Sequence, residues 1–229
     1  MAIYVLIGGR STKFLNDFSL EKKIFNKLNI INPNVLFIPA AAYKDINVAV
    51  DKFTKLIDDY LCDVKFLTDL EDINVIDRLF DWADIIYFGG GTCEVLVEKV
   101  KTSPLYEVLL KYQNSNKVYA GLSAGAMLFC NYGMGDAHVY SYNGHIYNYQ
   151  MVKCLGFLNI TICPHYDHDG LWCYNDEVKN YKCDSYAIED DTALIFIDGK
   201  YQVVKNDNSK SIYYFDSTNG YQMEPIYEV

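Results

Sequence analysis

The sequence predicts an α/β fold, a three-layer sandwich in which a mostly parallel sheet lies between two layers of helices. Short, continuously apolar segments alternate with amphipathic segments through residues 3–129. Strands without a polar face are typical of a parallel sheet that helices cover on both sides. Towards the C-terminus, shorter segments rich in β-branched and aromatic residues are separated by turn residues. These segments predict an antiparallel extension at the edge of the sheet.

Each element has its own signal in the sequence. The parallel strands are expected at residues 3–7, 35–39, 63–67, 84–88 and 117–122. The helices are expected at residues 18–28, 45–62, 73–82, 93–101 and 105–113, where apolar residues recur at helical spacing. Residues 132–150, rich in Gly, Tyr, Asn and His, predict a loop. Later strands are expected at 158–163, 186–189, 193–197, 201–204 and 211–215. Since the sequence has no linker or internal repeat, we predict that residues 1–229 form a single domain.

Composition excludes several classes of protein. The net charge is −10, so the chain has no basic stripe that could hold a phosphate backbone, and we expect no nucleic-acid partner. No apolar segment approaches the roughly 20 residues that span a bilayer. The N-terminus has no basic leader, so we expect a cytoplasmic protein without a membrane partner. The seven cysteines include no C-x-x-C pair, which predicts reduced thiols. The 21 tyrosines favour half-buried positions at a pocket or at the contact of a homodimer.

A Gly-x-Ser-x-Gly motif at residues 121–125 lies at the centre of the predicted site. An apolar strand precedes it and a helix-forming segment follows it, which is the arrangement of a nucleophile elbow. Glycines are needed on both sides of the serine because side chains would collide in so tight a turn. We therefore interpret Ser123 as a nucleophile. The alternative is a strand-to-helix turn with a capping serine.

Three consecutive glycines, Gly89, Gly90 and Gly91, follow the predicted strand 84–88. They lie at the C-terminal end of a parallel strand, where open α/β sheets bind their ligands. Glycines allow backbone N–H groups to turn towards a small anion, so we interpret this loop as an oxyanion hole. A structural turn and a phosphate cradle are the alternatives, but neither G-x-G-x-x-G nor a P-loop motif is present here.

A serine nucleophile needs a base, and histidine is the usual one. The histidines of the chain are His138, His145, His165 and His168. We favour His165 because the strand before it and Pro164 fix its backbone, whereas the first two lie in the predicted loop. The sequence His-Tyr-Asp-His-Asp at 165–169 could instead bind a metal, but this spacing on a loop is non-specific. We expect no metal and interpret His168 as a surface or pocket-rim residue.

The base needs an acid that orients its ring and stabilises the imidazolium. Asp136 would give the order Ser–Asp–His along the chain, and Glu189 would give the order Ser–His–Glu. Asp167 is too close to His165 in the chain to be the first choice. Because the test is geometric, the residues alone leave Asp136 and Glu189 as alternatives. Asp136 could also be a turn residue, and Glu189 a solvated strand end.

Together these segments resemble the peptidase E (aspartyl dipeptidase) and cyanophycinase-like family of serine peptidases. The resemblance is carried by residues 87–92, 121–126 and 164–167, with a weaker match at 187–190. It implies the fold of class I glutamine amidotransferases, a flavodoxin-like sandwich. It implies that Ser123 is the nucleophile and His165 the base, without a cofactor. It also implies an oxyanion hole made by N–H groups of Gly90, Gly91 and Ala124. The third catalytic residue would be Asp136, which we slightly favour, or Glu189.

Two departures from the family's pattern concern the substrate. The family recognises an N-terminal aspartate with an arginine downstream of the histidine. The only cationic residues in segment 172–182 of this sequence are two lysines, Lys179 and Lys182. Lysine cannot form the bidentate fork to a carboxylate. Thr92 replaces the usual asparagine after the oxyanion glycines. We therefore expect a small-peptide substrate without strict Asp specificity, bound near Thr92, Tyr166 and Lys182. The alternatives are an esterase or amidase, or a catalytically idle member that binds a ligand.

Overall fold

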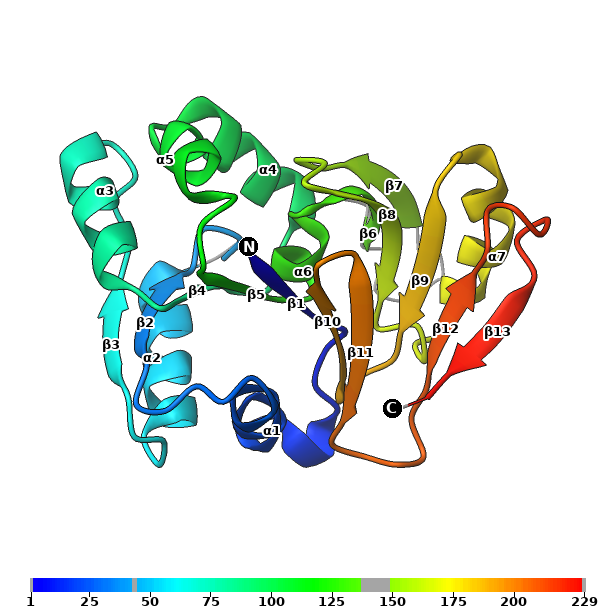
Figure 1. Ribbon diagram of the computed structural model, residues 1–229, viewed down its shortest axis with the longest axis horizontal. Helices are drawn as coiled ribbons and strands as arrows, with labels where there is room; N and C mark the ends of the chain where they lie inside the picture. The colour runs from blue at the N-terminus through cyan, green and yellow to red at the C-terminus, as the bar shows by residue number, and fades with distance from the viewer. Residues whose placement is uncertain (1, 43–44, 137–148, 228–229) are drawn as a thin grey trace.

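The computed structural model describes residues 2–42, 45–136 and 149–227. In that part of the chain, one sheet has seven strands in the order β11-β10-β1-β5-β4-β2-β3 (Figure 1). The parallel strands are β1 (Ile3–Ile7), β2 (Asn34–Ile38), β3 (Asp63–Phe66), β4 (Ile85–Phe88) and β5 (Val118–Leu122). The antiparallel strands β10 (Thr192–Ile197) and β11 (Lys200–Lys205) extend the sheet beyond β1. The predicted mostly parallel sheet is confirmed, and β10 and β11 form its antiparallel edge. The other strands predicted for that extension, at 158–163, 186–189 and 211–215, lie instead in a second sheet.

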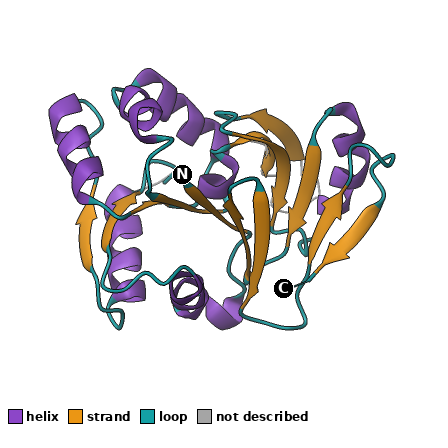
Figure 2. Cartoon of the chain, in the orientation of Figure 1, coloured by secondary structure: helices purple, strands orange, loops and turns teal. Residues whose placement is uncertain are grey.

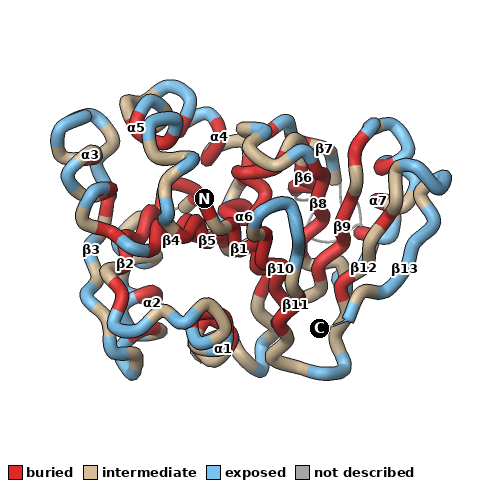
Figure 3. The backbone as a smooth tube through the Cα atoms, in the orientation of Figure 1, coloured by how far each residue is buried: buried red, intermediate tan, exposed pale blue. Residues whose placement is uncertain are grey.

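Helices cover both faces of this sheet, as predicted (Figure 2). One face packs against α1 (Ser19–Lys27) and α2 (Ile46–Ile57). The other packs against α3 (Ile73–Trp82), α4 (Cys93–Thr102) and α5 (Leu105–Tyr112). Side chains of β1 alternate between the two cores: Val5 faces the α1 and α2 side, and Leu6 faces the opposite side. The central strands are buried along most of their length (Figure 3), because each face has its own apolar cover.

A second sheet, six-stranded in the described part of the chain, has the order β13-β12-β9-β8-β6-β7. Its strands are β6 (Cys130–Asp136), β7 (Tyr149–Lys153), β8 (Leu158–Pro164), β9 (Asp184–Ile188), β12 (Ile212–Phe215) and β13 (Met223–Ile226). The prediction of a loop over 132–150 is therefore wrong at both ends, while residues 137–148 lie outside the described residues. The glycines of β6 allow close packing rather than a loop, since a Cβ on Gly133 would lie 2.4 Å from the sulfur of Met127.

Two short connections bring the sheets together. The strand β9 belongs to the second sheet and β10 to the first, so residues 189–191 cross between them. This crossing is held against the end of β1, because Asp191 donates its N–H to the carbonyl of Gly9 (3.0 Å) and Gly8 donates its N–H to Thr192 (3.0 Å). On the other side, α6 (Ala124–Met127) joins β5 to β6. The seam between the sheets therefore receives the ends of β1, β5, β8 and β9.

The remaining helices are short, and α7 (Tyr174–Glu177) lies beside the second sheet (Figure 1). The others are 3₁₀ turns at Leu171–Cys173 and Val178–Asn180, with a further 3₁₀ turn at Thr12–Phe14 after β1. None of the described helices is both long enough and apolar enough to cross a membrane.

Candidate active site

Ser123 lies in the tight turn between β5 and α6, as the motif predicts. Its backbone has φ 53° and ψ −110°, a conformation that a non-glycine residue rarely adopts. A Cβ on Gly121 would lie 2.2 Å from the carbonyl of Gly125, and a Cβ on Gly125 would lie 2.2 Å from the carbonyl oxygen of Phe88. The two glycines therefore allow the turn to fold back on itself, and the turn holds Ser123 in its strained conformation.

His165 reaches Ser123 from the turn that follows β8. Its Nε2 lies 2.9 Å from the Oγ of Ser123. The backbone of His165 also has a positive φ, of 54°, and its carbonyl accepts a hydrogen bond from the N–H of His168 (2.8 Å). The neighbouring Tyr166 donates its N–H to the carbonyl of Ile188 at the end of β9 (3.2 Å). These contacts fix the histidine turn at the seam between the sheets.

The carboxylate that meets His165 belongs to Asp190. Its Oδ1 lies 2.6 Å from the Nδ1 of His165, and its side chain is only 3% exposed. Glu189, one of the two acids that the sequence left open, does not take this place; it accepts a hydrogen bond from the N–H of Ser211 (2.8 Å). Asp190 begins the turn between β9 and β10, and its carboxylate, not that of Glu189, faces His165. Asp136 ends β6, and its side chain lies outside the described residues.

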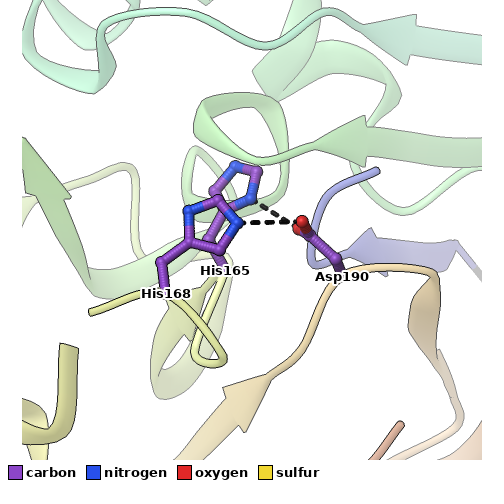
Figure 4. Close-up of side chains that lie close together, drawn as sticks. All are labelled: His165, His168 and Asp190. Carbon is purple, nitrogen blue, oxygen red and sulfur yellow. Dashed lines mark hydrogen bonds and ion pairs between the residues drawn. The ribbon is translucent and has the colours of Figure 1, made fainter. Parts of the chain in front are cut away.

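A second histidine shares the carboxylate of Asp190. The Nε2 of His168 lies 2.9 Å from Oδ2, the oxygen that His165 leaves free (Figure 4). The two imidazole rings lie beside each other, with centroids 4.9 Å apart. Burial raises the pKa of Asp190, but the hydrogen bonds and charges of His165 and then His168 outweigh burial and hold that pKa below its ordinary value. The geometry therefore favours an ionised carboxylate between two rings.

Further residues hold this carboxylate in place. The N–H of Asp190 donates to Oδ1 of Asp167 (2.9 Å), and the other oxygen of Asp167 pairs with Lys210. On the opposite side lies Gly9, where a Cβ would be 2.0 Å from Oδ1 of Asp190 and 2.2 Å from Nδ1 of His165. Only a glycine leaves room for the acid and the ring to meet there.

The glycine loop after β4 runs beside Ser123. A Cβ on Gly90 would lie 3.6 Å from the Cβ of Ser123, so the loop backbone passes next to the hydroxyl-bearing residue. Gly91 has φ 147°, and a Cβ there would overlap the carbonyl of Ala41. Among the described residues, the N–H groups of Gly90, Gly91 and Ala124 make no loop or turn hydrogen bond to another backbone carbonyl. The oxyanion hole at Gly90, Gly91 and Ala124 therefore stays a prediction, with its glycine loop next to Ser123.

Comparison with known proteins assigns the family. The model of peptidase family S51 matches residues 4–204. The chain belongs to peptidase family S51. This S51 chain is 28% identical over 217 residues to the uncharacterized peptidase YgaJ of Bacillus subtilis (strain 168), covering 92% of this chain and 90% of that relative. The protein is therefore a hydrolase, a peptidase, and the resemblance that the motifs indicated is confirmed.

Solved structures confirm the fold of the S51 peptidase. A peptidase from an acI-B1 actinobacterium is 21% identical and matches with a TM-score of 0.72, over 99% of this chain and 94% of that chain. A protein assigned as peptidase E from Listeria monocytogenes EGD-e is 20% identical and matches with a TM-score of 0.67, over 90% of this chain and 100% of that chain. At these identities the likeness concerns the fold alone.

Thr92, Tyr166 and Lys182, which we expected to bind substrate, make no hydrogen bond to Ser123, His165 or Asp190 among the described residues of this S51 peptidase. Thr92 precedes α4 and donates its N–H to the carbonyl of Ala41 (3.1 Å), so it anchors the glycine loop. Tyr166 donates its hydroxyl hydrogen to Oδ1 of Asn175 (2.8 Å), and burial is the main cause that raises its pKa. Lys182 is exposed, on the segment between α7 and β9.

Sequence reasoning missed three residues of this arrangement: Asp190, His168 as its second partner, and Gly9. The acidic run 189–191 directly after a strand was the available signal for the acid, but it does not reveal which residue faces the seam. The Gly8–Gly9 pair at the end of β1 was a second signal, since adjacent glycines at a strand end indicate close approach of another segment. His168 gave no signal beyond its spacing from His165.

Proposed function

We propose that this peptidase hydrolyses short peptides through an acyl-enzyme on Ser123, with His165 as the base and Asp190 as its orienting acid. The observation that carries the proposal is the chain of hydrogen bonds from Oγ of Ser123 through both ring nitrogens of His165 to Oδ1 of Asp190. Nucleophile, base and acid in this order are the parts that acyl transfer requires.

Each residue then has a defined step. The Oγ of Ser123 attacks the peptide carbonyl carbon while its proton passes to Nε2 of His165. The negative charge that develops on the carbonyl oxygen is stabilised by N–H groups of Gly90, Gly91 and Ala124. The protonated ring next gives its proton to the departing amine, and the peptide C–N bond breaks. A water molecule then gives a proton to the same nitrogen and attacks the ester carbonyl carbon. The bond from that carbon to Oγ breaks, and His165 returns the proton to Ser123.

Asp190 supports these steps by remaining ionised. A carboxylate at Nδ1 favours the tautomer in which that nitrogen carries the proton and Nε2 is free to accept one from Ser123. It also stabilises the imidazolium that forms after the transfer. The hydrogen bond between Asp190 and His168 leaves fewer orientations open to the carboxylate, so His168 acts as a positioning residue in this proposal.

The substrate proposed is a short peptide without a strict requirement for an N-terminal aspartate. A desolvated substrate carboxylate needs a cationic partner. Arg10 is engaged elsewhere, since its guanidinium pairs with the fully buried Glu21. Lys179 pairs with Asp176 (2.7 Å) on the surface. These pairings support a preference for neutral or mixed N-terminal side chains.

Labelling with a fluorophosphonate probe, followed by a panel of dipeptides, tests the proposal. We expect the probe to modify Ser123, as mapped by mass spectrometry of the digested protein, and dipeptides to be cleaved. Absence of both labelling and cleavage would favour a catalytically idle member of the family. Cleavage of simple esters or of non-peptide amides, with no dipeptide cleaved, would favour the alternative function of an esterase or amidase.

A further inference from the structure

The histidine turn and Asp190 bring together a set of metal-binding atoms. One nitrogen each from His165 and His168 and a carboxylate oxygen of Asp190 all lie within 4.8 Å of one another. The ring nitrogens concerned are those that face the carboxylate, Nδ1 of His165 and Nε2 of His168 (Figure 4). We propose that these three residues form an inhibitory Zn²⁺ site, at which the ion competes with catalysis rather than assisting it.

The chemistry of these donors selects the ion. Two imidazole nitrogens and one carboxylate are a donor set that Zn²⁺ takes in tetrahedral sites, with the fourth position left to water. Mg²⁺ and Ca²⁺ prefer sites made of oxygen alone. The set therefore favours a borderline divalent ion such as Zn²⁺ over the abundant hard cations.

The geometry permits an ion after a small adjustment. Donor atoms of a tetrahedral zinc site with bonds of about 2.0–2.1 Å lie roughly 3.3 Å apart. The nitrogen–oxygen distances here are 2.6 and 2.9 Å, each to a different oxygen of Asp190, and all donor atoms lie within 4.8 Å of one another. To surround one ion, the rings have to shift by roughly 1–2 Å and turn towards a common point. His168 can move in this way because its side chain is 52% exposed on a turn.

The site is also open to an ion from solvent. Asp190 lies at its buried base, held by the hydrogen bond from its N–H to Asp167. The rings of His165 and His168 form the rim, with side chains 31% and 52% exposed. The net charge of −10 further attracts a divalent cation to the surface of the protein.

Binding at this site would stop the proposed reaction through the tautomer of His165. When Nδ1 coordinates the ion, the neutral ring carries its proton on Nε2, which faces Oγ of Ser123. That nitrogen then donates a hydrogen bond and can no longer accept the serine proton. This inhibitory consequence rests on the proposed function, whereas the binding of the ion does not.

Isothermal titration calorimetry with Zn²⁺ and with Mg²⁺ tests binding without any substrate. We expect one Zn²⁺ per chain and no measurable heat from Mg²⁺. His168→Asn removes one of the three donors and should weaken Zn²⁺ binding by at least about tenfold. The matched control is Asp169→Asn, which removes an exposed carboxylate of the same turn outside the cluster and should bind as the wild type does. Equal affinity of His168→Asn and wild type, or equal binding of Mg²⁺, would overturn the site.

Two further measurements separate the zinc site from the proposed function. Ser123→Ala keeps all three donors, so it should bind Zn²⁺ with wild-type affinity although it lacks the nucleophile. In the wild type, Zn²⁺ should inhibit dipeptide cleavage and EDTA should restore it, and His168→Asn should need at least about ten times more Zn²⁺. If no peptide is cleaved, the calorimetry still decides the site. A Zn²⁺-saturated enzyme that cleaves at full rate would contradict inhibition.

Discussion

His165 and Asp190 are 25 residues apart in the chain, and their side chains meet at 2.6 Å where the two sheets join. The histidine follows β8 and the aspartate follows β9, two parallel neighbours in the second sheet. Their carboxyl ends lie at the same edge, which also faces the end of β5 and Ser123. The pairing of strands therefore assembles residues that no single motif contains.

Neutralising Asp190 should lower kcat strongly, whereas neutralising its neighbour Glu189 should leave kcat almost unchanged. Asp190→Asn keeps the shape of the side chain but removes the charge that orients His165, so we expect kcat to fall by about 10⁴-fold. Glu189→Gln is the matched control, because its carboxylate contacts the N–H of Ser211 instead of a histidine. It should keep kcat within a few-fold of wild type. Steady-state kinetics on one dipeptide compares the three proteins, and a larger loss for Glu189→Gln would contradict this assignment.

Removal of the Ser123 hydroxyl should abolish turnover but leave the fold intact. We expect Ser123→Ala to lose at least about 10³-fold in kcat and all fluorophosphonate labelling. Thermal unfolding should give a Tm close to that of wild type, since the change deletes one oxygen at the surface of the elbow. Ser209→Ala, in an exposed turn, is the control and should label normally. Unchanged hydrolysis by the Ser123 variant would disprove the serine mechanism.

Gly9 should be intolerant of even one added methyl group. A Cβ there would overlap both Asp190 and His165, so Gly9→Ala should separate the pair and lower kcat by at least about tenfold. Gly220→Ala is the control: its φ is 67°, but nothing lies within 4 Å of the added atom. That change should cost only about 1 kcal/mol of stability and leave kcat unaltered. Activity of Gly9→Ala equal to wild type would show that the contact is easily relieved.

Most of the fold could be predicted because it depends on local pattern. The apolar strands and the amphipathic helices of the first half lie within a few residues of their predicted positions, as Ile3–Ile7 and Ile73–Trp82 illustrate. The failure at β6 has a physical cause. Gly133 and Gly135 are typical of a loop in sequence, yet here they let the strand pass over Met127 and α6. Local propensity cannot anticipate a tertiary contact of this kind.

The candidate site could be predicted only in part for a related reason. Ser123 lies in a motif whose local structure requires its glycines, and His165 follows a clear strand, so both could be picked out from the sequence. The acid depends on which of two neighbouring carboxylates faces the seam, and this follows from how β9 crosses to β10. One residue of register separates Glu189 from Asp190, which the sequence alone does not resolve.

Recognition of an N-terminal aspartate needs a cation that reaches the substrate. In the described chain, the arginine next to the site, Arg10, already pairs with Glu21. Arg10 follows Gly9, but its guanidinium is buried against Glu21, whose Oε1 also accepts a hydrogen bond from Tyr87 (2.8 Å). Moving Arg10 to the site would leave Glu21 as an unpaired buried charge, at a cost of several kcal/mol. We therefore expect Arg10 to remain with Glu21 when substrate binds.

We accordingly expect Asp-Leu to be cleaved no better than Ala-Leu or Leu-Leu. Competition between the dipeptides, followed by chromatography of the released amino acids, measures the ratios of kcat/KM directly. Lys182→Ala and Lys179→Ala test the two lysines downstream of the histidine, and neither should change the ratio for Asp-Leu by more than a few-fold, since a flexible ammonium discriminates weakly for a planar carboxylate. A hundredfold preference for Asp-Leu, equivalent to about 2.7 kcal/mol, would contradict this expectation. If Lys182→Ala alone then removed the preference, that lysine would be the cation that binds the substrate carboxylate.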